Sequence, residues 1–244
     1  MTPALSVVVP CFNEGSIIEA TAERLLRVLP GLAGEFEVVF CNDGSTDDTW
    51  ERVKALAARD PRIRAEGYAA NKGAGHAFRT ALAAASSRVI VHMDADLAMD
   101  PVAAGRACID GLGSADLVFC SRYAGVRADY PLYRRLPSLA YRRLYRGLLG
   151  IPVNDAMSGF FGLRREVLGQ IAPLRMDGFE VYLELLVKAR QAGLRIREVP
   201  VEFVHQTGSG EFSVLADGPR QLLNTLRVWR RFVLHGDKPE ELPP

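Results

Sequence analysis

The first 121 residues repeat one pattern, in which a short run of β-branched residues is followed by a polar loop and then by a stretch with the apolar spacing of a helix. This alternation predicts parallel strands joined by helices. Runs such as SVVV and RVIVHM are apolar throughout, which is typical of strands covered on both faces. The sequence therefore predicts an α/β fold with a doubly wound, mostly parallel central sheet and helices on both faces. We expect strands at Leu5–Val9, Glu37–Phe40, Ile63–Tyr68, Val89–Met93 and Leu117–Cys120, and helices near 17–29, 47–59, 75–86 and 101–112.

After residue 121 this pattern gives way to an arginine-rich segment and a Gly-Phe-Phe-Gly stretch. No linker and no internal repeat separates the second half from the first. We expect a helix near 179–192, a strand near 195–204 and a last helix near 212–233. The sequence therefore predicts a single domain, with its bounds at 1–234, its two halves at 1–121 and 122–234, and a C-terminal tail at 235–244.

The charge balance, the cysteines and the apolar runs bear on the expected partners and location of the protein. Thirty Lys and Arg balance twenty-nine Asp and Glu, so the formal net charge is +1, and nucleic acid is not an expected partner. The four cysteines show no CxxC spacing and lie in or beside apolar runs, so we expect core residues rather than metal ligands or disulfides. The N-terminus lacks the basic region of a signal peptide, and no apolar run reaches the length of a membrane span. We therefore expect a cytoplasmic protein.

Polar loops follow the predicted strands, and the carboxyl ends of parallel strands meet at one edge of a sheet. The loop after Val89–Met93 reads Asp94-Ala95-Asp96. Two carboxylates one residue apart are hard oxygen ligands that hold Mg²⁺ or Mn²⁺ and leave other positions open for phosphate oxygens. The alternative is a solvated turn in which Asp96 or Asp100 caps the helix that begins near Pro101.

Two further loops are candidates for binding at the same edge. Asp43, in Asn42–Asp47, offers a carboxylate that accepts hydrogen bonds from a nucleobase or a ribose; the alternative is a tight turn. The stretch Asn71–Gly75 lacks the third glycine of a GxGxxG pattern, because Phe78 stands there, so a nicotinamide cofactor is not expected. Gly73 either lets the backbone approach a substrate or simply turns the chain.

Seven short motifs carry a resemblance to a known family. In chain order they read VVVPCFNE, NDGSTDDT, NKGAGHA, DADLAMDP, CSRY, DAMSGFFGLRREVL and GFEVYLELLVKA. They resemble the family 2 glycosyltransferases with the GT-A fold, and the resemblance covers roughly residues 4–213. Within that family they look most like the dolichol-phosphate mannose synthase group, which includes bacterial polyprenyl-phosphate glycosyltransferases. The resemblance implies a GT-A type sheet, with a nucleotide-sugar half at 1–121 and an acceptor- and membrane-facing half at 122–234.

The resemblance also implies roles for individual residues. The donor would be a GDP- or UDP-hexose, with Mg²⁺ or Mn²⁺ held on its diphosphate by Asp94 and Asp96. Arg122 and Tyr123 would lie near the phosphates or the incoming acceptor, and transfer would invert the anomeric carbon. The base and ribose would be held by Pro10, Phe12, Glu14 and Asp43. The acceptor side would be lined by Asp155, Ser158, Gly159 and Phe160.

The chemistry of such a transfer points to two catalytic groups. Departure of a nucleoside diphosphate builds negative charge, which a divalent ion and one arginine stabilise; we therefore expect Asp96, through the ion, and Arg122 to act in catalysis. A phosphate acceptor needs no general base, since its second pKa is about 6. A hydroxyl acceptor needs a base within hydrogen-bond reach. Asp177 and Glu180 are candidates for that base, with helix capping and first-turn charge as the alternative.

The arginine-rich segment bears on the acceptor. Residues 122–146 hold seven arginines and one acid, Asp129, interleaved with leucines and tyrosines. Such a mixture is typical of segments that lie at an anionic membrane surface; the alternative is a solvated arginine face over a core stripe. Pro137 is expected to break or kink any single helix here. We expect peripheral contact with the cytosolic face of a membrane, joined by residues of the last helix, namely Arg220, Arg227, Trp229, Arg230, Arg231 and Phe232.

Three departures from the family pattern concern the acceptor and the metal. Ala74 stands where relatives often carry lysine, and Ala98 where some carry a polar residue that helps hold the metal. Residues 205–213 lack the Arg and the Ser-Lys pair that usually contact phosphates in polyprenyl-phosphate transferases.

Transfer of a hexose to a polyprenyl phosphate is the leading hypothesis. Transfer to a hydroxyl of a soluble metabolite, glycan or protein, and non-catalytic binding of a nucleotide sugar, are the alternatives. The donor base, the sugar and the oligomeric state stay open.

Overall fold

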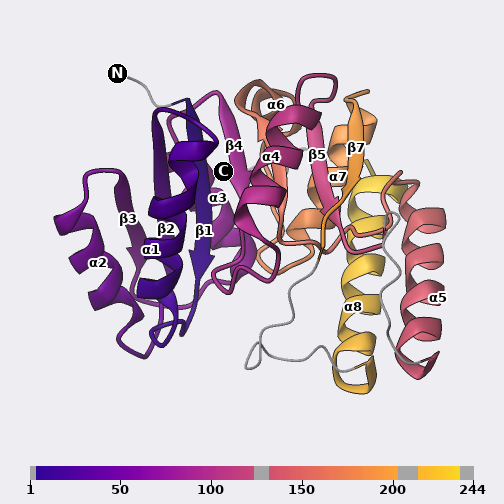
Figure 1. Cartoon of the computed structure of the whole chain (residues 1–244). Coiled ribbons are helices and arrows are strands. Elements are labelled where there is room, and N and C mark those ends of the chain that lie inside the picture. Colours follow the sequence, from indigo (N-terminus) through magenta and orange to yellow (C-terminus); the bar gives the residue numbers. More distant parts are fainter. Residues whose placement is uncertain (1–3, 124–131, 203–213, 237–244) are drawn as a thin grey trace, which may run out of the picture.

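The computed structural model describes residues 4–123, 132–202 and 214–236 (Figure 1). A seven-stranded sheet runs through the molecule in the order β3-β2-β1-β4-β6-β5-β7. All neighbouring strands are parallel except β6, which runs antiparallel to both β4 and β5. The strands are β1 Leu5–Cys11, β2 Phe36–Asp43, β3 Ile63–Tyr68, β4 Val89–His92, β5 Leu117–Ser121, β6 Phe161–Arg164 and β7 Ile196–Pro200.

Helices cover both faces of this sheet, because its strands bury side chains in both directions. In β1, Val8 packs into the core that holds Phe78, whereas Val7 and Val9 pack into the core that holds Ile18. All five side chains are fully buried. The helices are α1 Ile18–Val28, α2 Thr49–Arg59, α3 Ala74–Ala84, α4 Pro101–Gly111, α5 Leu132–Leu149, α6 Arg165–Ile171, α7 Val181–Gln191 and α8 Val214–Val228, with a 3-10 turn at Leu29–Gly31 and a π-helical turn at Trp229–Leu234.

The position of the site follows from the strand order. The chain runs outward from β1 to β2 and β3 and then returns to β4 on the other side of β1. The order therefore reverses between β1 and β4, which is where doubly wound sheets bind ligands, at the carboxyl ends of the strands. Helices α5 and α8 lie side by side next to β7 and extend beyond the carboxyl ends of the strands (Figure 1).

The parallel strands and their crossover helices confirm the fold that the sequence predicts. The expected strand over 195–204 is confirmed for Ile196–Pro200. The antiparallel strand β6 and helix α6 were not predicted. We expected Pro137 to break or kink a helix in the arginine-rich segment, and the break is wrong, because α5 is continuous from Leu132 to Leu149. This helix packs against α8, where the Tyr141 and Thr225 hydroxyls lie 2.7 Å apart, and tertiary packing of this kind supplies most of a helix's stability in a protein.

Two further expectations concern the core and the membrane. All four cysteines are free and buried, as predicted. Phe232, which was expected to join a membrane-facing surface, is instead fully buried in the core, where Lys188 Nζ of α7 lies 4.8 Å from the centroid of its ring. In the part of the chain that the structure describes, no helix has both the length and the apolarity required to cross a bilayer.

Candidate functional site

Acidic side chains gather where the loops that follow β1 and β4 meet. The pKa of Asp94 is raised to about 7 by burial, then by the charge of Asp96, with Arg122 opposing and Glu14 adding to the rise. Burial also raises the pKa of Asp96, although the Ala98 amide donates to its carboxylate at 3.0 Å. The pKa of Glu14 is raised by burial and by the charges of Asp96 and Asp47. These carboxylates therefore share one electrostatic environment that favours a cation.

Backbone strain marks the same loops. Among the described residues, Asn13 and Leu97 are the non-glycine residues with positive φ, at 57° and 47°. Asn13 lies in the loop after β1 and Leu97 directly follows Asp96. Strained backbone of this kind persists where the surrounding structure imposes it, which is most often at functional sites.

The structure shows which acidic residue caps helix α4, the alternative role considered for this loop. Asp100 caps helix α4, because its carboxylate accepts from the amides of Val102 and Ala103 at 3.1 and 2.9 Å. Asp94 and Asp96 are therefore not needed for that cap. Over residues 4–123, 132–202 and 214–236, no group of three or more His, Cys, Asp or Glu is arranged to hold a metal ion. The half-buried, crowded acid pair suits a cation that takes its remaining ligands from a substrate.

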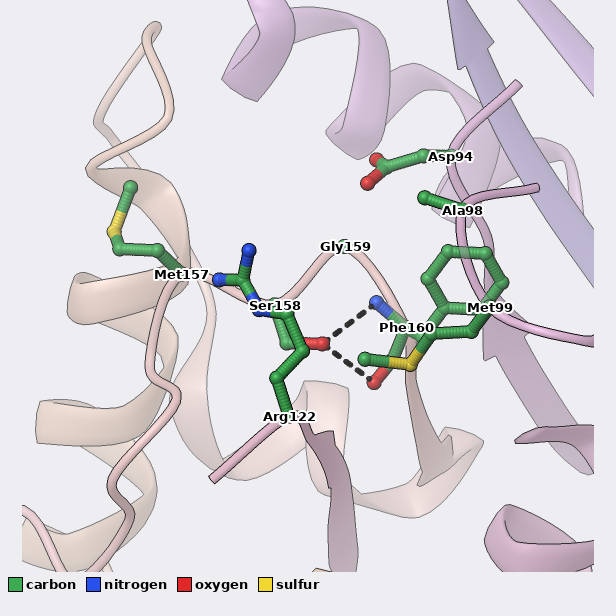
Figure 2. A pocket seen from close by; sticks show the side chains of 8 residues that line it. All are labelled: Asp94, Ala98, Met99, Arg122, Met157, Ser158, Gly159 and Phe160. Atoms are coloured by element: carbon green, nitrogen blue, oxygen red, sulfur yellow. Dashed lines mark hydrogen bonds between the residues drawn. The ribbon is translucent and has the colours of Figure 1, made fainter. Parts of the chain in front are cut away.

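A small pocket is lined by residues from both halves of the chain. Figure 2 shows Asp94 on one wall and the Arg122 guanidinium on the opposite wall, with Ser158 and Gly159 between them. Asp94 follows β4 and Arg122 follows β5, whereas the floor comes from the loop before β6. The remaining lining residues are Ala98, Met99, Met157 and Phe160.

Arg122 is held by Asp155 through a bidentate ion pair. Its Nε and Nη2 donate to the two carboxylate oxygens at 2.8 Å each, and its backbone N donates to Asp155 Oδ2 at 3.0 Å. The side chain of Asp155 is buried, with 2% exposed, whereas that of Arg122 is 29% exposed. Asp155 thus orients the arginine rather than presenting a free carboxylate to an acceptor.

Ser158 and Gly159 form the turn that lies against Asp94. The Ser158 hydroxyl is paired with the Phe160 backbone, accepting from its N at 3.3 Å and donating to its O at 3.4 Å (Figure 2). A Cβ on Gly159 would lie 1.8 Å from Asp94 Oδ2, so a larger residue here would force the Asp94 carboxylate or the turn to move. The Gly159 carbonyl accepts a 2.7 Å hydrogen bond from His92 Nδ1, and burial lowers the pKa of His92 to about 4, which keeps the ring neutral.

Asp43 is placed at the end of β2, where it ties down the neighbouring loop. Its Oδ1 accepts from the Tyr68 hydroxyl at 2.6 Å and from the amides of Lys72 and Gly73 at 2.9 and 3.1 Å. Its Oδ2 accepts from Asn71 Nδ2 at 3.1 Å. Oδ2 therefore keeps more accepting capacity for a ligand than Oδ1.

The loop Asn71–Gly75, called here the glycine loop, lies against the backbone at Asp177. Gly73 has a φ of +98°, and a Cβ there would lie 2.4 Å from the Asp177 carbonyl oxygen. Gly75 N donates to that same oxygen at 2.6 Å. Asp177, a candidate base, is paired with Arg79 at 2.5 Å, whereas the other candidate, Glu180, is largely buried at the start of α7. The close approach at Gly73 thus serves chain packing.

The remaining predicted residues border the site. Pro10 lies in β1 opposite Cys41 of β2, and the Phe12 ring beyond the strand end is 43% exposed. The guanidinium groups of Arg122 and Arg142 make cation–π contacts with the Tyr123 ring. Their Cζ atoms lie 5.4 and 4.1 Å from its centroid. Arg142 belongs to α5, so this stacking connects that helix to the pocket.

Several residues that support the site were missed by the sequence analysis. His92 is the polar residue at the end of an otherwise apolar strand, and that interruption was a usable signal. Its Nε2 lies 3.2 Å from the Tyr182 hydroxyl of α7. Glu198, in β7, contacts the Asn154–Asp155 segment, and nothing in its local sequence points to that pairing.

A mostly parallel sheet of this order, with an acidic loop at its switch point and an arginine facing it, agrees with the GT-A fold that the sequence motifs imply. The family profile described as "Glycosyl transferase family 2" matches residues 6–172, so the chain belongs to glycosyl transferase family 2. It is 32% identical over 223 residues to a dolichol-phosphate mannosyltransferase of Saccharomyces cerevisiae, covering 87% of this chain and 82% of that protein.

Other relatives extend beyond this chain. A dolichol-phosphate mannosyltransferase of Pyrococcus furiosus is 31% identical over 205 residues, covering 82% of this chain but only 56% of that protein. Among solved structures, glucosyl-3-phosphoglycerate synthase of Mycobacterium tuberculosis, in complex with Mn²⁺, UDP-glucose and phosphoglyceric acid, superposes with a TM-score of 0.65 at 24% identity. The match covers 93% of this chain and 80% of that one, and it shows that the fold is shared.

Proposed function

We propose that this chain is an inverting, metal-dependent glycosyltransferase that moves a hexose from a GDP- or UDP-sugar to a polyprenyl phosphate. The observation that carries the proposal is the pocket at the switch point, in which Asp94 and Arg122 lie on opposite walls. The acid proposed to hold the cation thus faces an arginine across a space lined by both halves of the chain. That is the arrangement needed to bind a sugar diphosphate and to stabilise it as it leaves.

The donor would lie over the loops that follow β1, β2 and β4. Asp94 and Asp96 would hold Mg²⁺ or Mn²⁺, which supplies Lewis-acid stabilisation of the diphosphate. The exposed ring of Phe12 and the Pro10 segment would contact the base, with Glu14 and Asp43 oxygens left to accept from the base or ribose. A cation in contact with Asp94 and Asp96 would lower their raised pKa values and keep both carboxylates ionised.

Arg122 would act on the leaving group. The attacking oxygen forms a bond to the anomeric carbon as the bond from that carbon to the diphosphate breaks, and negative charge builds on the departing oxygen. A guanidinium that is held in place by Asp155 stabilises this charge without having to reorient. A phosphomonoester acceptor is mostly ionised near pH 7, so it attacks without a general base. This fits the structure, because neither candidate base is among the residues that line the pocket, and Asp177 is paired with Arg79 whereas Glu180 is buried.

The acceptor assignment is supported by the names of the relatives, which act on dolichol phosphate. The surface of α8 fits a lipid acceptor as well. Leu222, Leu223 and Leu226 expose 39, 56 and 40% of their surface, and Arg227 and Arg230 are exposed beside them. An apolar stripe flanked by arginines suits peripheral contact with the cytosolic face of an anionic membrane. The segment 205–213, whose missing Arg and Lys kept a hydroxyl acceptor open, lies outside the described residues.

A donor and acceptor panel tests the proposal. GDP- and UDP-hexoses are offered with Mn²⁺, with and without polyprenyl phosphate, and both nucleotide release and lipid-linked sugar are measured. We expect one donor to give lipid-linked product only when the polyprenyl phosphate and the divalent ion are both present. A water-soluble glycoside as the only product would replace this function with transfer to a hydroxyl. Absence of turnover with tight nucleotide-sugar binding would replace it with a binding function.

A further inference from the structure

Glu198 lies on β7, the edge strand next to β5, and its carboxylate accepts three hydrogen bonds from one short segment. Oε1 accepts from the backbone amides of Asn154 and Asp155, each at 2.9 Å. Oε2 accepts from Asn154 Nδ2 at 2.8 Å. Two successive amides and a side chain are therefore directed at one carboxylate, which fixes the position of this peptide.

Helix α5 holds the same segment from the other side. The Tyr145 hydroxyl donates to the Asn154 carbonyl, and Arg146 Nη1 donates to Asn154 Oδ1. Asn154 is thus bound through its amide, its carbonyl and both ends of its side chain. The segment forms a rigid bridge between β7 and α5.

The consequence of this bridge appears one residue later, at Asp155. Its carboxylate holds the guanidinium and the backbone amide of Arg122, which in turn faces Asp94 across the pocket. Glu198 on β7 and Arg122 after β5 lie on neighbouring strands. Phe119 of β5 is opposite Glu198, and Val201 N donates to Ser121 O at 3.1 Å. Glu198 is therefore linked to Arg122 through the Asn154–Asp155 peptide and the Asp155 carboxylate.

We infer that Glu198 is a positioning residue for glycosyl transfer: by fixing the Asn154–Asp155 peptide it sets the direction in which Arg122 points into the Asp94 pocket. The inference rests on the proposed role of Arg122 and deepens it, because it assigns the orientation of that arginine to a carboxylate on the edge strand. Misplacing a charged group by about 1 Å in an active site costs on the order of a hundredfold in rate, so a residue outside the pocket controls turnover in this way.

The Glu198→Gln substitution isolates this effect. The amide oxygen of glutamine still accepts from the two backbone amides, but its NH₂ cannot accept from Asn154 Nδ2, so one of the three bonds is lost while the volume is kept. Arg197→Gln is the matched control, since Arg197 is the preceding residue of β7 and its exposed side chain donates to Ser114 Oγ at 3.3 Å, away from this segment. Both variants change one side chain of the same edge strand.

The first experiment reads the position of Arg122 directly. In ¹⁵N-labelled full-length protein without substrate, the Nε–H resonance of Arg122 is assigned by its loss in Arg122→Lys. We expect this resonance to shift or broaden in Glu198→Gln and to stay in place in Arg197→Gln. An Arg122 resonance that is unchanged both in Glu198→Gln and in Glu198→Ala, which removes all three hydrogen bonds, overturns the inference, whatever the kinetics show.

The second experiment is a double-mutant cycle on turnover. With the best donor and polyprenyl phosphate, we expect Glu198→Gln to lower kcat about tenfold, with the donor KM within about twofold, and to have no further effect on kcat in the Arg122→Lys background. Its decrease in Tm should be the same in both backgrounds. An equal drop in kcat in both backgrounds, or no drop in either, overturns the inference. If Arg122→Lys alone keeps full turnover while Glu198→Gln moves the Arg122 resonance, the proposed role of Arg122 fails and the structural link from Glu198 stands.

Discussion

Gly159 lies so close to Asp94 that a Cβ at position 159 would fall 1.8 Å from Oδ2 and 2.1 Å from Oδ1. The two residues come from different halves of the chain, Asp94 from the loop after β4 and Gly159 from the turn before β6. His92, two residues before Asp94, holds the Gly159 carbonyl at 2.7 Å. The backbone of the second half thus forms one wall around the acid of the first half, and the position of each depends on the other.

We expect Gly159→Ala to lower kcat by about a hundredfold or more, since the added methyl must displace the Asp94 carboxylate or the turn itself. Steady-state kinetics with the best donor and circular dichroism of the folded protein are the measurements. Gly169→Ala is the matched control, because Gly169 lies in α6 with open space around it and alanine favours a helix. Full turnover in Gly159→Ala would contradict the contact as described.

The ion pair of Arg122 and Asp155 has a counterpart at the other end of β5. Asp155→Asn leaves one carbonyl oxygen where two carboxylate oxygens held the guanidinium, so we expect kcat to fall about tenfold. Asp116→Asn loosens the similar fork between Asp116 and Arg195, whose two bonds are 3.1 Å long and lie on the surface. Turnover measured side by side should fall only in the first variant. Equal turnover in the two variants would show that the fork at Arg122 has no role in transfer.

Glu37 gives a pH-dependent prediction away from the site. Burial raises its pKa, but hydrogen bonds from Ser6 and Ser86, together with the charge of Arg64, outweigh burial and leave the pKa below the usual value. A carboxyl whose pKa is lower in the folded state stabilises the fold above its unfolded pKa of about 4.3, and this contribution is lost as the pH falls through the folded pKa.

Glu37→Gln should therefore lower the free energy of unfolding by about 1–2 kcal/mol at pH 7, with a smaller difference from wild type at pH 3. Urea unfolding at the two pH values checks this. Glu35→Gln is the control, because Glu35 is exposed just before β2, and we expect it to be neutral at both. A destabilisation that is as large at pH 3 as at pH 7 would mean that the ionised form of Glu37 is not the one that the fold stabilises.

The leucines of α8 predict membrane contact. Leu223→Ser together with Leu226→Ser removes two exposed apolar side chains, so we expect weaker flotation with liposomes that contain anionic lipid. Val102→Ser is the control, since Val102 is 40% exposed on α4 and lies on another surface. Raising the ionic strength should also weaken binding through the exposed arginines. Flotation that is the same in the double variant and the control would remove α8 from the membrane contact.

The parallel half of the fold could be predicted because β1, β2, β4 and β5 are largely apolar runs and because turn residues and helices separate the strands. The short antiparallel strand β6 could not, since Phe161–Arg164 has only four residues and contains Gly162, and its pairing is set by the distant strands β4 and β5. Helix α5 was missed because Pro137 argues locally against it, whereas packing against α8 stabilises it.

The acidic loop of the site could be predicted because Asp94 and Asp96 directly follow a strand. Asp155 shows where sequence reasoning stops. Its motif indicated the acceptor side, but whether its carboxylate faces an acceptor or Arg122 depends on how the loop before β6 folds back on β5. The same holds for Asp43, whose four internal donors come from β3 and the glycine loop. Such pairings are tertiary, so no local spacing encodes them.

The central claim is that Asp94 and Asp96 hold a divalent cation on the diphosphate of a nucleotide. Calorimetric titration of GDP and of UDP, with and without Mn²⁺, measures it directly in wild type, in Asp96→Asn and in the control Asp110→Asn, which changes an exposed residue of α4. We predict that Mn²⁺ tightens binding of one nucleotide about tenfold or more, equivalent to at least ~1.4 kcal/mol, in wild type and in the control, and that Asp96→Asn loses this gain. Binding that is equally tight without the ion, or a gain that Asp96→Asn retains, would contradict it.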